Sequence, residues 1–585
     1  MRAFAASVRC VALQAAGGGR RASASARLSA GWGVALGAAL ALPGLAIADG
    51  RAGAPAAEFE GVVFDDRDGD GRQDAREPGL PDVALSDGLR LVRTDARGQY
   101  RLVTQPGRTV FAIKPAGWRF AERADGLPAF WAHAASADLP QPKYGGLTAT
   151  TGPRLDIALR REPPRASGLD VLVFGDPQVK SLADVGYYAR DIIDSVRSRS
   201  APPQGDAPSP KLGLSLGDIA DDVLSLYPAL NAETRRIGIP WLHAAGNHDI
   251  DFDVAHDEHS LLSFRNTFGP DTFAWEEREA VFVVLDDVIY RPGQKPQYIG
   301  GLREDQFAFL EAYLAAAPKD RLLVLAMHIP LFEPEGRDTF RDEDRERLFR
   351  LLEAFPKALV LSAHNHTQQH YFHDARSGWR GAAPLHEYNV GATCGAYWSG
   401  AKDARGVPDA TMPDGTPNGY AQLRVEAGGG YRLAWRVAGL AQTSSAAVPT
   451  EACCTDSAST HNIGLHAPKA LRRGAYPGWA VYANVYMGHE KTRVEYRIGD
   501  GEWKPMTRVL RADPRLLIEN VRDDLAETLR GYDRSPEAEP SKHLWRGALP
   551  TDLALGEHRI EVRAFDDWQG EQRASTSYRL LEAAN

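Results

Sequence analysis

Five short polar motifs in this 585-residue sequence carry side chains that commonly bind metal ions. In chain order they are Asp176-Pro177-Gln178, Gly217-Asp218-Ile219-Ala220-Asp221, Gly246-Asn247-His248-Asp249, His328-Ile329-Pro330 and His364-Asn365-His366. A mixture of carboxylate, amide and imidazole ligands favours Mn, Fe, Zn or Co over Mg and Ca. Six such ligands exceed the usual need of one metal, so the motifs predict two divalent cations about 3.5 to 4 Å apart, an arrangement suited to in-line displacement at phosphorus.

Each motif closely follows a short, mainly apolar run, at 171–174, 212–216, 241–245, 322–327 and 358–361. Such runs are typical of buried parallel strands. Helices are expected between them at 184–197, 222–235, 257–268, 304–316 and 342–352. Because the carboxyl ends of strands in an open α/β sheet meet at one edge, we expect the five motifs to form one site.

The order and spacing of the motifs resemble the calcineurin-like metallophosphoesterases, over roughly residues 170–438. The resemblance implies an α/β fold with a central four-layer α/β/β/α sandwich. It also implies an enzyme that hydrolyses a phosphoester with a hydroxide held by two metals. It also implies that Asp218 bridges the metals and that Asp176 and His366 complete the first site. The second metal is then expected to bind Asn247, His328 and His364.

The same resemblance assigns His248 to the substrate phosphate, where it stabilises charge or protonates the leaving oxygen, and Asp221 to the orientation of His248. One position departs from the family, because Gln178 stands where a His is usual. Its carbonyl oxygen is a weaker ligand than imidazole, so the first metal is expected to bind less tightly or to differ in identity. Asp221 also replaces the Tyr of purple acid phosphatases, so no iron-tyrosinate chromophore is expected.

The substrate class follows less directly from these residues. No cluster of Lys or Arg accompanies the motifs to hold a monoester dianion, which gives a slight preference for a phosphodiester of a small molecule or lipid. Two alternatives remain: a nucleotide or phospholipid pyrophosphatase, and a surface or matrix-binding protein whose phosphoesterase domain is catalytically impaired. Gln178 is the main argument for the second alternative.

Residues outside the motifs invite further interpretations. Asp286 and Asp287 follow the apolar run 281–285 and are read as a solvated turn, with a role behind the site as the alternative. Tyr397 and Trp398 either line a substrate pocket or pack against the C-terminal region.

Two further domains are expected on either side of a metallophosphoesterase domain at 168–440. Residues 57–160 alternate in the manner of strands and predict a β-sandwich spacer, and 460–585 predict a second β-sandwich. The first resembles the B-type repeat modules of bacterial surface adhesins, and the whole layout resembles exported bacterial metallophosphoesterases with a family-specific C-terminal β domain. Within the first domain, a calcium loop is predicted from the spacing of Asp66, Asp68, Asp70, Asp74 and Glu77. The alternative is a solvated acidic turn.

Residues 1–48 combine arginines, an apolar stretch and small residues before Asp49, which predicts a cleaved secretory signal peptide. The protein is therefore expected in the periplasm or outside the cell, without a transmembrane anchor after cleavage.

The formal net charge of −9 argues against bulk binding to nucleic acid. Export permits a disulfide, but the pairing among Cys394, Cys453 and Cys454 stays open.

Overall fold

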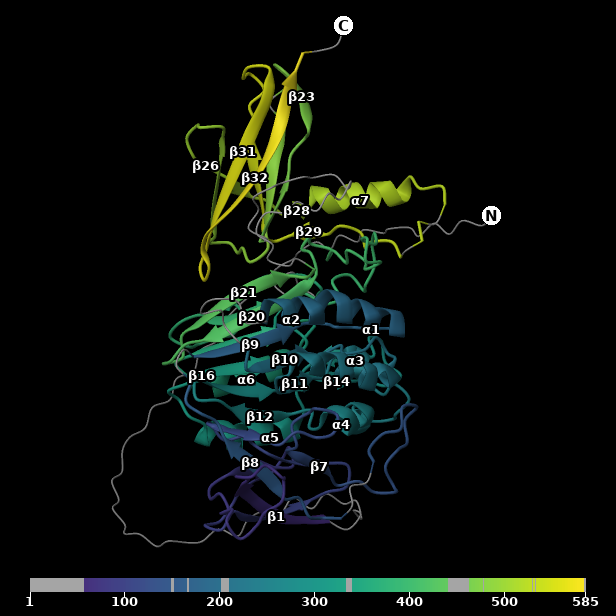
Figure 1. The fold of residues 1–585 in the computed structure, drawn as a ribbon, viewed down its shortest axis with the longest axis vertical. Helices are drawn as coiled ribbons and strands as arrows, with labels where there is room; N and C mark the ends of the chain where they lie inside the picture. The colour runs from purple at the N-terminus through teal and green to yellow at the C-terminus, as the bar shows by residue number, and fades with distance from the viewer. Residues whose placement is uncertain are drawn as a thin grey trace, which may run out of the picture. The chain divides into compact units, whose positions relative to one another are not determined.

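The computed structural model describes residues 57–148, 152–165, 168–200, 210–332, 339–439, 462–476, 478–528, 530–531 and 533–582. The predicted signal peptide, Cys453 and Cys454 lie outside these ranges. Residues 54–585 form one compact unit, and Figure 1 shows its ribbon. Within the described ranges, no helix has the length and apolar character needed to cross a bilayer.

Residues 57–165, called here the N-terminal domain, form two four-stranded sheets with the orders β4-β1-β8-β6 and β3-β2-β5-β7. In β4 buried and exposed side chains alternate, because one face of its sheet lies in the core, whereas β2, β5 and β7 of the second sheet are buried throughout. Their bounds are β1 (Ala57–Asp65), β2 (Ala84–Ser86), β3 (Leu91–Arg93), β4 (Gln99–Thr104), β5 (Thr109–Ala112), β6 (Trp118–Phe120), β7 (Trp131–His133) and β8 (Ile157–Arg161).

The central domain, residues 168–439, contains two larger sheets with the orders β11-β10-β9-β20-β21 and β12-β13-β16-β17-β19-β18. All five predicted strands form. Wherever two of these five strands are neighbours in a sheet, they run parallel to each other. The first sheet comprises β9 (Leu169–Phe174), β10 (Leu212–Leu216), β11 (Trp241–Ala244), β20 (Gly419–Val425) and β21 (Tyr431–Val437). The second comprises β12 (Phe273–Glu276), β13 (Ala280–Val284), β16 (Leu322–Ala326), β17 (Ala358–Ser362), β18 (Gln369–His373) and β19 (Leu385–Asn389).

The central helices follow the predicted alternation, and the predicted α/β fold class is confirmed. They are α1 (Leu182–Tyr188), η1 (Ala189–Ile193), α2 (Asp194–Ser200), η2 (Leu224–Leu226), α3 (Tyr227–Thr234), η3 (Arg235–Ile237), η4 (Asn247–Asp249), η5 (Asp257–His259), α4 (Leu262–Phe268), α5 (Glu304–Ala316) and α6 (Asp342–Leu352). A small hairpin adds β14 (Val288–Tyr290) and β15 (Tyr298–Gly300). The α-helix predicted from residue 222 begins only at Tyr227, because Pro228 fits the first turn of a helix and not its interior.

Residues 462–582, the C-terminal domain, have their own apolar core and three sheets, with the orders β22-β24-β30-β27, β23-β32-β31-β25-β26 and β28-β29. The strands are β22 (Ile463–His466), β23 (Ala470–Arg472), β24 (Ala480–Val485), β25 (Arg493–Ile498), β26 (Lys504–Pro505), β27 (Thr507–Arg508), β28 (Arg511–Ala512), β29 (Pro540–Ser541), β30 (Leu544–Ala548), β31 (Gly556–Asp566) and β32 (Gly570–Leu581). The sequence interpretation missed one helix here, α7 (Pro514–Asp524). Asp513 caps it by accepting a hydrogen bond from the Arg515 amide, and Pro514 occupies its first turn.

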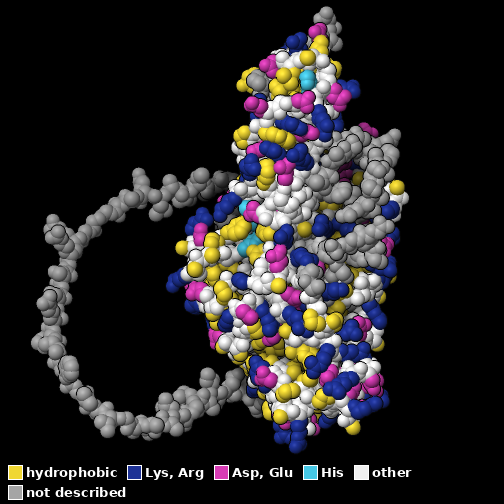
Figure 2. Space-filling model, turned by 60° about the vertical axis from the view of Figure 1, so that its left-hand side comes forward, with side chains coloured by type: hydrophobic (Ala, Val, Ile, Leu, Met, Phe, Trp, Pro, Cys, Tyr) yellow, Lys and Arg dark blue, Asp and Glu magenta, His cyan; other side chains and the backbone are white. Residues whose placement is uncertain are grey.

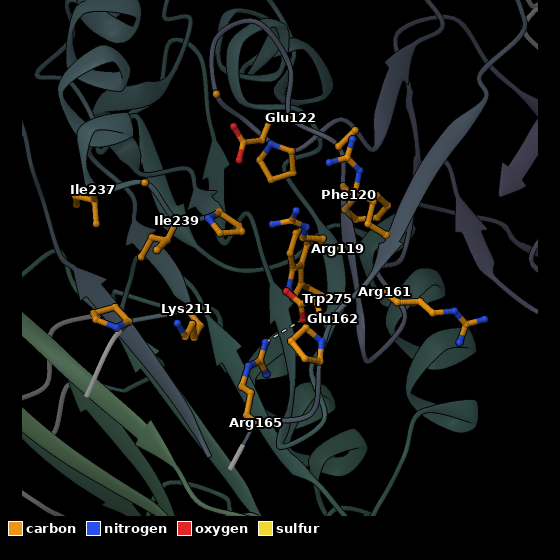
Figure 3. A pocket seen from close by; sticks show the side chains of 18 of the residues that line it. Arg119, Phe120, Glu122, Arg161, Glu162, Arg165, Lys211, Ile237, Ile239 and Trp275 are labelled. Atoms are coloured by element: carbon orange, nitrogen blue, oxygen red, sulfur yellow. Dashed lines mark hydrogen bonds and ion pairs between the residues drawn. The ribbon is translucent and has the colours of Figure 1, made fainter. Parts of the chain in front are cut away.

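A buried charge cluster joins the N-terminal and central domains. Glu277 accepts hydrogen bonds from Trp275 Nε1 at 2.8 Å and from Arg165 Nη2 at 2.8 Å, and Lys114 Nζ lies 3.0 Å from it. Arg165 also pairs with Glu162, as Figure 3 shows, on the wall of a 1560 Å³ cleft between the two domains. That cleft contains none of the five polar motifs. On the face drawn in Figure 2, Lys and Arg are interspersed with Asp and Glu.

Candidate metal centre

The fold brings together side chains from the ends of strands in both central sheets. His328, after β16, is the centre of this group. Its Nε2 lies 3.3 Å from Asp218 Oδ2, 3.1 Å from Asn247 Oδ1 and 3.2 Å from His364 Nδ1. The possible ligand atoms of Asp218, His328 and His364 all lie within 4.8 Å of one another.

The remaining predicted ligands of the first metal lie beside this group. Asp176, after β9, accepts hydrogen bonds from the backbone amide of His364, at 3.2 Å from each carboxylate oxygen. His366 Nε2 lies 3.7 Å from Asp176 Oδ1. All six predicted strand-end ligands therefore meet in one region, although the roles assigned to them stay predictions.

The backbone at the site is strained. Ten non-glycine residues in the described ranges have a positive φ, and five of them are predicted ligands. The left-handed region is unfavourable for residues with a Cβ, and each such residue costs about 1 to 3 kcal/mol. Strain of this kind persists only where the surrounding structure enforces it, which marks this region as functional. The five residues, with their φ values, are Asp176 (41°), Gln178 (37°), Asp218 (47°), His364 (72°) and His366 (49°).

The two carboxylates of the site are fully buried. Burial raises the pKa of Asp176 to about 7, with a smaller contribution from the neighbouring charge of Asp218. Burial also raises the pKa of Asp218, but the adjacent His328 outweighs this and holds it below the usual value. Buried carboxylates require cationic partners. The donor set is one that binds divalent transition metals, so these residues fit a pair of cations.

Backbone carbonyl groups fix the orientation of two imidazoles. His328 Nδ1 lies 2.8 Å from Leu216 O, and His366 Nδ1 lies 2.8 Å from Gly395 O. A carbonyl group accepts, so each Nδ1 carries the proton and each Nε2 is left as the metal-binding nitrogen.

Asp286 and Asp287 are buried, so the solvated turn expected for them is wrong. Asp287 accepts hydrogen bonds from the amides of His328 and Ile329, at 3.0 and 2.8 Å. Asp286 pairs with Arg303 at 2.5 Å. The strand end at 286–287 therefore supports the backbone of a predicted ligand, which was the alternative role.

His248 lies between two carboxylates, not one. Its Nδ1 is 2.9 Å from Asp222 Oδ1 and 3.2 Å from Asp221 Oδ1, and its backbone amide donates to Asp218 Oδ1 at 2.8 Å. Burial lowers the pKa of His248, but the Asp222 hydrogen bond and the charges of Asp218, Asp222 and Asp221 raise it to about 9. Sequence reasoning named Asp221 alone; Asp222, its direct neighbour, is the closer partner.

Gln178 is buried beside the predicted first metal site. Its amide group contacts Asp221 through Nε2, at 3.4 Å, and Cys394 Sγ lies 3.9 Å from its Oε1. Cys394 is a free, buried thiol.

Tyr397 is partly exposed, and its ring centroid lies 4.5 Å from that of His366, so it covers the site from the side of the 391–418 loop.

The predicted calcium loop brings the carboxylates of Asp66, Asp68 and Asp70 within 4.8 Å of one another. Asp66 also pairs with Arg160 at 3.2 Å. Glu77 accepts hydrogen bonds from the amides of Arg67 and Asp74, at 2.8 and 3.1 Å, and Asp74 pairs with Arg76. Protein groups thus already satisfy several of these oxygens, and calcium binding stays a prediction.

Comparison with known proteins agrees with this geometry. Residues 169–368 match the family described as calcineurin-like phosphoesterase, 67–142 match the N-terminal part of that family and 387–572 its C-terminal part. No curated protein matches the chain. A solved purple acid phosphatase, PPD1 from yellow lupin (Lupinus luteus) seeds, shares 14% sequence identity over 61% of this chain and 67% of its own, with a TM-score of 0.33. The chain thus belongs to the calcineurin-like phosphoesterases and is a metal-dependent phosphoester hydrolase.

Proposed function

We propose that the substrate is a phosphodiester of a small molecule or lipid. The observation that supports this is the charge around the site. In the described part of the chain, the charges acting most strongly on Asp176, Asp218 and His248 come from carboxylates and imidazoles, without a Lys or Arg among them. Asp222 beside His248 is 55% exposed. A diester monoanion fits such a site better than a monoester dianion, because less negative charge has to be accommodated.

The proposed ligands are Asp176, Gln178 and His366 for one metal, Asn247, His328 and His364 for the other, and Asp218 for both. When bound, the two cations, taken from Mn, Fe, Zn or Co, supply an activated water and the positive charge that neutralises the phosphoryl oxygens. His248 is the proposed proton donor to the leaving oxygen. Its Nδ1 faces Asp222 and Asp221, so Nε2 is the nitrogen that can reach the substrate.

Purified protein should be assayed with bis(p-nitrophenyl) phosphate and p-nitrophenyl phosphate after its metal content is measured. We expect a higher kcat/KM for the diester, and a loss of about 100-fold or more in kcat for both substrates in His248→Ala. His256→Ala, at an exposed histidine on a nearby loop, is the matched control and should keep full activity. A higher kcat/KM for the monoester would refute the diester preference, and unchanged activity of His248→Ala would refute its role.

Export by a signal peptide at 1–48 is part of the proposal and has its own test. Cells expressing the full chain should hold the activity in the periplasm or the medium, and cells expressing residues 49–585 should hold it in the cytoplasm. Equal distribution of the two chains would refute export through this segment.

A further inference from the structure

The 391–418 loop holds the predicted ligand His366 from two sides. On the ring side, Gly395 O accepts the hydrogen bond from His366 Nδ1 at 2.8 Å. On the backbone side, the amide of Gln368, two residues after His366, donates to Asp414 Oδ2 at 2.8 Å. One loop thus controls both the direction of the imidazole and the path of the chain that carries it.

Asp414 is itself held by the C-terminal domain. Its Oδ2 lies 3.0 Å from His543 Nε2, and its backbone carbonyl accepts a hydrogen bond from Asn484 Nδ2 at 2.8 Å. His543 Nδ1 lies 2.6 Å from Asn484 Oδ1, so the two C-terminal side chains also hold each other. Asp414, Asn484 and His543 are at most 2% exposed, which keeps water from replacing these contacts.

A second anchor lies one residue further along the same loop. Arg515 Nη2 donates to Gly415 O at 2.9 Å and pairs with Asp513 at 2.7 Å. Gly415 has a φ of 82°, and a Cβ at this position would lie 2.4 Å from Asp513 Cβ. The loop therefore approaches the C-terminal domain as closely as only glycine allows.

We infer that the C-terminal domain positions the first metal site, with Asp414 and His543 as positioning residues that act through the Gln368 amide on His366. A buried carboxylate that accepts hydrogen bonds from both sides transmits the position of one element to the other. The inference rests on the ligand assignment proposed above. Removing such an outer contact typically weakens metal binding 10- to 100-fold, and we expect about 10-fold here because Asp414 acts through the backbone.

The test titrates the full-length metal-free protein with Co²⁺ and records its visible absorption, which reports ligand geometry independently of turnover. The variants are Asp414→Asn, which keeps the side-chain shape, and His543→Phe. His558→Phe is the control, because His558 lies in the same domain and its contacts, with Ala554 O at 2.8 Å and with the Tyr578 ring at 5.4 Å between centroids, are within that domain. Hydrogen exchange over residues 364–370 provides a second readout.

In Asp414→Asn and His543→Phe we expect about 10-fold weaker binding of one Co²⁺, an altered spectrum and faster exchange over 364–370. None of these changes is expected in His558→Phe. Unchanged Co²⁺ binding in folded variants would overturn the inference, and so would equal weakening in His558→Phe, which would indicate general loosening. Should His543→Phe fail to fold, Asp414→Asn decides by the same criteria. Absence of Co²⁺ binding in the unmodified protein would instead refute the ligand assignment itself, and this inference with it.

Discussion

Glu277 provides a quantitative test of the junction between the N-terminal and central domains. The carboxylate is 3% exposed and lies within 3.0 Å of Lys114, Arg165 and Trp275 nitrogens. Burial raises the pKa of Glu277, but the charges of Lys114 and Arg165 outweigh it and hold the pKa below its usual value. Its stabilising contribution is therefore present at neutral pH and is lost as the pH falls through that lowered pKa.

Replacing Glu277 with Gln removes the charge and leaves the buried Lys114 ammonium without a carboxylate partner, beside the Glu276 carbonyl at 3.0 Å and the Trp275 ring at 5.4 Å. Breaking a buried ion pair in this way costs about 3 to 5 kcal/mol. The N-terminal and central domains share one continuous apolar core. Together they span about 380 residues, which implies an unfolding entropy of roughly 0.8 kcal/mol/K. The expected decrease in Tm is then about 4 to 6 °C.

Scanning calorimetry measures this change and contains an internal control, because the C-terminal domain has a separate core. The transition of the shared core should move, and that of the C-terminal domain should not. The double variant Glu277→Leu with Lys114→Met should recover at least half of the loss, because it leaves no unpaired buried charge. A single-variant shift below about 1 °C, or a double variant no more stable than the single one, would refute the reasoning.

Three further predictions concern the central domain. Burial raises the pKa of Asp251 to about 6, so the folded state favours its neutral form and the free energy of unfolding decreases as the pH rises through that value. In urea unfolding, Asp251→Asn should be more stable than the unmodified protein at pH 8, by up to about 3 kcal/mol, and equally stable near pH 3. A difference that does not change with pH would contradict this. Asp222→Asn should lower kcat about 10- to 100-fold, and Asp221→Asn should lower it less, because Asp222 is the closer partner of His248. A larger loss of kcat in Asp221→Asn, measured in steady-state assays, would identify Asp221 as the more important partner. Gln178→His should lower the metal concentration for half-maximal occupancy, and an unchanged titration would mean that Gln178 is not a ligand.

The strands of the central domain could be predicted because their signal is local. The run 322–326 is apolar throughout, the run 212–216 is apolar except for Ser215, and both end at a polar motif, so pattern alone identifies them. The type of residue at each strand end likewise indicated metal chemistry. The α5 and α6 helices were predicted with their observed bounds, because their sequences lack Gly and Pro.

The contacts that sequence reasoning missed depend on the path of the chain in space. Asp222 reaches His248 from a turn with a φ of 60°, and nothing in the sequence distinguishes it from Asp221. Asp414 joins Gln368 to His543 across 46 and 129 residues, respectively. The helix α7 was missed because strands surround it, although Asp513-Pro514 is a recognisable helix start.

The candidate ligands come from two different sheets, and this has a consequence for residues far from the chemistry. Asp176, Asp218 and Asn247 follow strands of one sheet, and the three histidines follow strands of the other. The spacing between the two ligand groups is therefore set by the apolar side chains packed between the sheets. A change of volume in that interior, such as Leu214→Ala, alters the fit of the sheets and hence the separation of the ligands. Mutational surveys of this enzyme should find activity defects among conservative substitutions of core residues that contact neither metal nor substrate.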